Sequence, residues 1–105
     1  LVNAADEIVV DKSNNSIPFE FSLGQNYPNP FNPVTTINFS LPVKGVVTLK
    51  IYDAAGREVK TLINEIKEAG QNSVAFDASL LSSGVYFYRL TSGSYTDTKK
   101  MMLIK

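Results

Sequence analysis

The stretch that decides the fold is VVTLKIYDAAGREVKTLI, residues 46–63. In its first half Val47, Leu49 and Ile51 alternate with Thr48 and Lys50. A period of two residues is typical of a strand that buries one face and exposes the other. The pattern therefore predicts a strand over residues 46–52.

A tight turn follows this strand. The turn is DAAG, residues 53–56, and Gly56 suits a position with a positive backbone angle φ. Two apolar runs separated by so short a turn are typical of a β-hairpin. We therefore expect residues 57–63 to return as the second strand of a hairpin.

Residues 57–69 also carry a competing helical pattern. Their apolar residues match the i, i+3, i+4, i+7 template, and Gly70 would end such a helix. On periodicity alone, helix and strand are evenly matched. The preceding turn and the β-rich surroundings favour a strand that is followed by a loop.

Five further strand candidates surround this hairpin, each bounded by Gly or turn residues. They cover residues 19–22, 35–41, 72–77, 85–91 and 95–104. Seven short strands with frequent turns are typical of an antiparallel β-sandwich. The side chains expected inside include Ile37, Phe39, Leu41, Val47, Leu49, Ile51, Val74 and Phe76, with Ser40 on the outer face.

The segment VYFYRL, residues 85–90, is bulky on both faces. The order of Leu80 or Leu81, then Gly84, then Tyr86 resembles the tyrosine corner of immunoglobulin-like sandwiches. We therefore place Tyr86, Tyr88 and Leu90 in the core.

A proline-rich segment, QNYPNPFNP, occupies residues 25–33. Three prolines in six positions exclude a helix and a central strand. We predict a rigid connection that closes one end of the sandwich, with Tyr27 and Phe31 plugging the core edge by burial.

The composition limits the classes of function. The 105 residues suffice for one domain, and the net charge is zero, so no overall basic field attracts nucleic acid or an anionic membrane. Cysteine and histidine are both absent, which excludes disulfides, thiolate metal sites and a Ser-His-Asp triad. The carboxylates are scattered, and we read Asp53, Asp77 and Asp97 as turn residues. We expect no enzymatic activity, no cofactor, no metal and no transmembrane segment.

The N-terminal residues 1–18 are interpreted as a flexible linker, and residues 19–105 as the folded domain. Because the sequence starts at Leu1, we expect it to be a piece of a longer chain. Ile8, Val9 and Val10 could add an edge strand. Protease cleavage, if it occurs, is expected between Asp11 and Ser16, where the chain is polar.

Several motifs together resemble a known family. They are LGQNYPNPFNP (23–33), INFSLP (37–42), IYD (51–53), GREV (56–59), AG (69–70), SGVYFYRL (83–90) and KKMMLIK (99–105). This series resembles the type A C-terminal sorting domains of the bacterial type IX secretion system, over residues 19–105. Its middle part is also similar, more generically, to the immunoglobulin-like domain of flagellar hook-capping proteins.

The resemblance implies an immunoglobulin-like sandwich at the C-terminus of a cargo protein. The cargo would reach the periplasm, cross the outer membrane through a translocon that recognises the sorting domain, and end at the cell surface or in the medium. The domain would often be cleaved off afterwards. The partners implied are the outer-membrane translocon and an upstream cargo domain of the same chain, and the oligomeric state stays open.

Two sets of site residues follow. The structural motif comprises Tyr27, Pro28, Asn29, Pro30, Phe31, Pro33, Gly56, Gly84 and Tyr86. The candidate recognition element for the translocon is Lys99, Lys100, Met101, Met102, Leu103, Ile104 and Lys105. Residues 85–105 hold four basic residues and one acidic residue, which suits docking by charge or by strand addition. The plainer reading is an edge strand whose lysines discourage aggregation.

One alternative belongs to a different class. A non-catalytic cell-surface or carbohydrate-binding module would need exposed aromatic rings in a row. Tyr52, Phe87 and Tyr95 are the candidates, with Phe87 expected to be covered.

Overall fold

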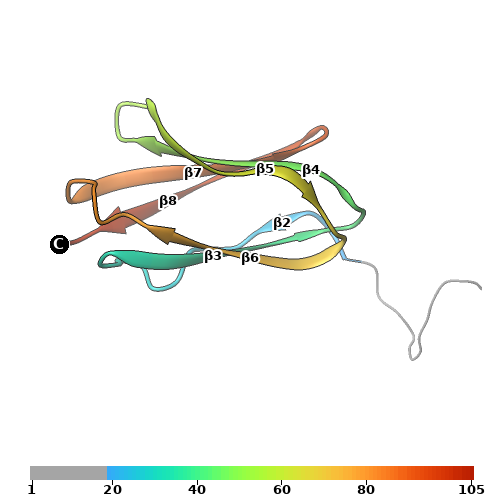
Figure 1. The fold of residues 1–105 in the computed structure, drawn as a ribbon, viewed down its shortest axis with the longest axis horizontal. Coiled ribbons are helices and arrows are strands. Elements are labelled where there is room, and N and C mark those ends of the chain that lie inside the picture. Colours follow the sequence, from blue (N-terminus) through green and yellow to red (C-terminus); the bar gives the residue numbers. More distant parts are fainter. Residues whose placement is uncertain (1–18) are drawn as a thin grey trace, which may run out of the picture.

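The computed structural model describes residues 19–105 as two antiparallel sheets packed face to face (Figure 1). One sheet has the order β2-β3-β6, formed by β2 (Ser22–Leu23), β3 (Val34–Leu41) and β6 (Gly70–Asp77). The other has the order β5-β4-β7-β8, formed by β4 (Gly45–Asp53), β5 (Glu58–Lys67), β7 (Gly84–Ser92) and β8 (Tyr95–Leu103). The predicted all-β sandwich of about seven strands is confirmed.

The chain passes between the two sheets three times, from β3 to β4, from β5 to β6 and from β6 to β7. This strand order is an immunoglobulin-like arrangement in which β5 lies beside β4 as an additional outer strand. In the described part of the chain, no helix has the length and apolarity that a bilayer crossing requires. The predicted linker, edge strand and cleavage stretch fall within residues 1–18 and lie outside the described residues.

The hairpin between β4 and β5 forms as predicted. Gly56 has φ of 86°, in the left-handed region that glycine adopts without a steric penalty. The Oδ1 atom of Asp53 accepts hydrogen bonds from the backbone N–H groups of Ala55 (3.0 Å) and Arg57 (2.9 Å). These bonds, above all the one from Arg57, lower the pKa of Asp53.

The second strand of this hairpin confirms one expectation and corrects another. β5 is a strand and not a helix, as expected, but it continues to Lys67, where we expected a loop after Ile63. The register of β4 and β5 shifts between Leu49 and Lys50, so Leu62 is an extra residue on the β5 side. Because a bulge interrupts strict alternation, β5 acquires apolar spacing that resembles a helix.

The core lies between the sheets and is mostly apolar, with Asn26, Thr35, Ser40 and Ser92 as the buried polar residues. Its largest fully buried side chains are Tyr88, Phe31, Phe39, Phe76, Ile37, Leu41, Leu49, Ile51, Leu90, Met101, Leu103 and Val47. Tyr86 is also buried, and its hydroxyl donates a 2.7 Å hydrogen bond to the carbonyl of Ser82, four residues upstream. The predicted tyrosine corner and core positions in β7 are confirmed.

The first strand is shorter than predicted and lies further along the chain, at Ser22–Leu23 instead of residues 19–22. Ser40, expected on an outer face, is buried. Its hydroxyl donates to the carbonyl of Glu20 (2.6 Å), so the incoming chain covers it.

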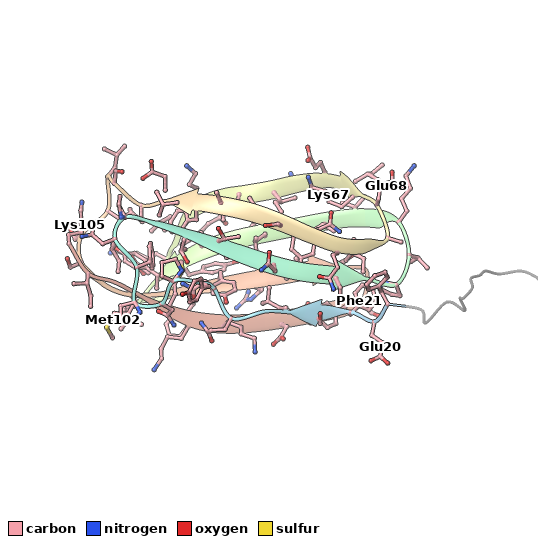
Figure 2. The ribbon with its side chains drawn as sticks, turned by 90° about the horizontal axis from the view of Figure 1, so that it is seen from below. Glu20, Phe21, Lys67, Glu68, Met102 and Lys105 are labelled. Atoms are coloured by element: carbon pink, nitrogen blue, oxygen red, sulfur yellow. The ribbon has the colours of Figure 1, made fainter. Side chains whose placement is uncertain are left out.

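The described chain enters at one end of the sandwich and finishes at the other. At the entry end, the ring of Phe21 stacks on Tyr95 with centroids 4.6 Å apart. Figure 2 shows Glu20 and Phe21 at this end, and Met102 and Lys105 at the opposite end.

Candidate functional site

The proline-rich segment, residues 25–33, which we call the proline loop, lies against the outer edge of β8. The backbone N–H of Phe31 donates to the carbonyl of Met102, and the N–H of Ile104 donates to the carbonyl of Phe31, both at 2.9 Å. Phe31 thereby forms a parallel bridge with Leu103. The loop behaves as a very short additional strand on this sheet.

Side-chain amides extend this pairing. The N–H of Met102 donates to Oδ1 of Asn29 (3.0 Å), and Nε2 of Gln25 donates to the carbonyl of Lys100 (2.8 Å). Prolines lack a backbone donor, and the amide of Gln25 supplies a donor to β8, while that of Asn29 supplies an acceptor. β8 is the outermost strand of its sheet, as predicted, but its edge from Lys100 to Ile104 is covered.

A buried polar network anchors the start of the loop. The hydroxyl of Tyr88 accepts from the N–H of Asn26 (2.8 Å) and donates to the carbonyl of Gly24 (2.7 Å). Nδ2 of Asn26 donates to Oγ1 of Thr35 (3.0 Å) and to the carbonyl of Pro28 (3.1 Å). Burial raises the pKa of Tyr88 to about 12.

Asn26 and Thr35 were absent from the predicted site residues, although both are buried. A signal for Asn26 exists in the sequence. Asn side chains commonly bond to backbone groups two residues along, and a loop with three prolines is short of backbone donors. The partner of Asn26, Tyr88, lies 62 residues away, so only the fold brings the two together.

The two aromatic residues of the loop have opposite environments. Phe31 is 2% exposed and packs against Phe76 at a centroid distance of 6.1 Å, which confirms it as a plug. The prediction that Tyr27 is also a plug is wrong, because its side chain is 80% exposed. Its backbone pairs with Thr36 through two 2.9 Å hydrogen bonds, and this pairing turns the ring outward.

The three prolines and Gly84 of the structural motif have the following positions. Pro28 and Pro30 lie on the surface, and the carbonyl of Pro33 accepts a 2.8 Å hydrogen bond from the N–H of Ala78. Gly84 begins β7, opposite Leu103 of β8.

The candidate recognition element divides into buried and exposed residues. Met101 and Leu103 are each 1% exposed and belong to the core. The alternate residues face outward: Lys100 is exposed, Met102 is 41% exposed and Ile104 is 50% exposed. Among residues 100–104, only the outward set is accessible to another protein.

The basic residues at the two ends of this element, Lys99 and Lys105, differ in their environments. Lys99 is half-buried. The Nζ atom of Lys105 donates to the carbonyls of Ser79 (2.6 Å) and Leu81 (2.9 Å), and its backbone N–H donates to Oγ of Ser83 (3.0 Å). Lys105 therefore fastens the chain to the turn between β6 and β7.

The aromatic residues considered for carbohydrate binding do not form an open row. Arg89 lies over the ring of Tyr52, 4.9 Å from its centroid, and Tyr95 is covered by Phe21. Phe87 is half-buried. A flat aromatic platform, which a sugar ring would need, is not formed by these three side chains.

Asp77 acts in a turn as expected, whereas Asp97 lies within β8 and not in a turn. Oδ1 of Asp77 accepts from the N–H of Ser79 (2.9 Å) and from its hydroxyl, and these bonds lower the pKa of Asp77. Asp97 accepts from the N–H of Thr98 (2.9 Å). Among the described residues, no three carboxylates gather into a group that could hold a metal ion.

A protein-family model described as a secretion system C-terminal sorting domain matches residues 25–105. The chain belongs to this family. The match begins at the proline loop and ends at the last residue of the candidate recognition element, and the structure brings these two regions into contact. The resemblance to sorting domains of the type IX system is confirmed, and this non-catalytic domain directs the secretion of the cargo to which it is attached.

Among solved structures, the chain is similar to PorZ, an essential bacterial surface component of the type-IX secretion system of Porphyromonas gingivalis. The identity is 19% and the TM-score 0.51, over 81% of this chain and 11% of that chain. This likeness supports the fold. The search of curated proteins found no match. For the sorting domain, interaction with the secretion machinery and with an attached cargo domain follows from its family, as does secretion to the cell surface.

Proposed function

We propose that the outer-membrane translocon of the type IX system recognises this domain at the end where the proline loop and β8 meet. The observation that carries the proposal is the pairing of Phe31 with Met102 and Ile104. It makes one rigid surface out of two segments about 70 residues apart. The family match contains both segments.

The position of this surface supports the proposal. The described chain enters at the opposite end, beside Phe21, so a cargo attached upstream would not cover it (Figure 2). In this arrangement residues 1–18 serve as the linker from the cargo, and residues 19–105 as the sorting domain.

The proposed route follows from such recognition. The cargo crosses the periplasm with the folded domain at its C-terminus, and the translocon binds the domain through the outward residues of the recognition element. The cargo then passes to the cell surface or the medium. Cleavage within Asp11–Ser16 would release it from the sorting domain.

The experiment that tests the proposal is export of a reporter. A signal peptide and a fluorescent protein are fused before residues 1–105 and expressed in a bacterium with a working type IX system. We expect the reporter at the surface or in the medium, and in the periplasm when the domain is omitted. Retention of the complete fusion in the periplasm, while the host exports its own cargo, would contradict the proposal.

Deletion of residues 99–105 would not separate recognition from folding, because it removes Met101 and Leu103 from the core. A substitution of an outward residue is sharper. Lys100→Glu reverses an exposed charge of β8, and we expect less export with an unchanged melting temperature. The matched control is Lys44→Glu, which breaks a surface ion pair with Glu68 (3.7 Å), an interaction that contributes little to stability. Equal export of the two variants would count against recognition by charge at β8.

A further inference from the structure

Tyr27 is held in an unusual way for an aromatic residue. Its side chain is 80% exposed, yet its N–H and carbonyl are both bonded to Thr36 at 2.9 Å. Within the described residues its hydroxyl takes part in no hydrogen bond, so the ring is not needed to hold the loop in place. An aromatic ring on a fixed backbone loses little conformational entropy on binding, and such residues commonly anchor interfaces.

Two apolar side chains lie next to the loop, one at the end of β8 and one just beyond it. Met102 is 41% exposed and Ile104 is 50% exposed. Both face outward because Met101 and Leu103 fill the core, and both are tied through their backbones to Phe31. Figure 2 shows Met102 projecting from the surface at this end of the molecule. The proline loop thus carries the exposed ring of Tyr27 and is bonded to the strand end that carries Met102 and Ile104.

We propose that Tyr27, Met102 and Ile104 form a single docking surface, called here the loop–strand surface, for an apolar pocket with an acidic rim on a protein of the secretion machinery. The proposal rests on the proposed function and names the chemistry of its partner. Lys100 is exposed on the same strand, two residues before Met102, whereas the ammonium group of Lys105 is bonded to the carbonyls of Ser79 and Leu81 and lies near Asp77. The exposed charge beside Met102 is therefore that of Lys100, so the complementary rim is acidic.

The hydrogen bonding of β8 also argues against another mode of docking. Strand addition needs unpaired backbone groups along an edge. From Lys100 to Ile104 this edge is already bonded to Gln25, Asn29 and Phe31. A partner that meets the closed edge therefore contacts side chains, and the outward side chains there are those of the loop–strand surface.

The test combines export of the reporter fusion with thermal unfolding of the isolated domain. Tyr27→Ala should lower the exported fraction about tenfold, the effect of losing one interface anchor, with an unchanged melting temperature. Tyr27→Phe, which keeps the ring, should restore export. The control is Val43→Ala, because Val43 is 63% exposed and lies in the connection between β3 and β4; its export should equal that of the original fusion.

The second variant is Met102→Gln, which keeps the length of the side chain and leaves the backbone bonds of residue 102 in place. It should reduce export in the same direction as Tyr27→Ala, also with an unchanged melting temperature. If both variants are exported as well as the original fusion, the loop–strand surface is overturned while the sorting function stands. If Tyr27→Ala lowers the melting temperature, the export of Met102→Gln alone tests the loop–strand surface. Failure of the unsubstituted fusion would instead overturn the proposed function.

Discussion

The two outer edges of the four-stranded sheet differ in whether another segment of the chain covers them. On β8, the proline loop bonds to the edge from Lys100 to Ile104. On β5, no strand or loop of the described chain pairs with the outer edge. An uncovered edge invites pairing with another chain, and charged side chains are one way to prevent it. β5 alternates charged and apolar residues along much of its length, so it relies on charge, whereas β8 relies on a fixed loop.

The comparison indicates a physical role for the proline motif, which is to cover an edge of the sheet. The motif does not lie in a free connection between elements. It closes the strand that carries the candidate recognition element, whose outward-facing side chains alternate with the buried Met101 and Leu103.

The largest effect is expected from Phe31→Ala. Phe31 is 2% exposed and packs against Phe76, and truncation of a large buried aromatic costs about 3–5 kcal/mol. The loop would lose its anchor on β8, so the covered edge would come to resemble the β5 edge. Urea unfolding measures the loss of stability, and amide hydrogen exchange at Met102 and Ile104 should accelerate. Unchanged stability would show that Phe31 is not a plug.

A smaller effect is expected from Tyr88→Phe. The substitution keeps the ring but leaves the N–H of Asn26 and the carbonyl of Gly24 without their partner. Burying such unsatisfied groups costs about 1–3 kcal/mol. Denaturant unfolding at neutral pH should show this loss, with an unchanged m-value.

The same variant has a signature in the dependence of stability on pH. The pKa of Tyr88 is about 12 in the folded protein, above the value near 10 of an unfolded tyrosine. The folded state therefore holds this proton more tightly, and its contribution is fully present below about pH 10 and is lost as the pH rises toward 12. Part of the decline in stability between pH 10 and 12 should disappear in Tyr88→Phe. An identical decline in both proteins would contradict the assignment to Tyr88.

Much of the fold could be predicted from the sequence because the alternation of apolar and polar residues along a strand indicates which side chains are buried. Val47, Leu49 and Ile51 are all fully buried, as their spacing indicated. Alternation fails where the backbone departs from a regular strand. The bulge at Leu62 produced helix-like spacing in β5, and no local pattern distinguishes that from a true helix.

The candidate site was less predictable, for a different physical reason. The sequence identified the proline loop and β8 as separate motifs, but not that they touch. Tyr27 and Phe31 have the same chemical character and lie four residues apart, so composition could not distinguish the exposed ring from the buried one. Their environments depend on partners elsewhere in the chain, namely Thr36 for Tyr27 and Met102 for Phe31.

The smallest change in stability, and the sharpest test of the edges, is expected from one substitution made at each edge. Lys60→Val removes an exposed charge from β5, and Lys100→Val removes one from β8. Each should alter stability by no more than about 0.5 kcal/mol, as is usual for surface positions. Their association should differ, because Lys60→Val leaves an unpaired edge with consecutive apolar β-formers, whereas the edge at Lys100 is closed by Gln25 and Phe31. Size-exclusion chromatography with light scattering should therefore show concentration-dependent association for Lys60→Val alone. If Lys100→Val associates equally, the proline loop does not protect β8, and charged side chains prevent association at both edges of the sheet.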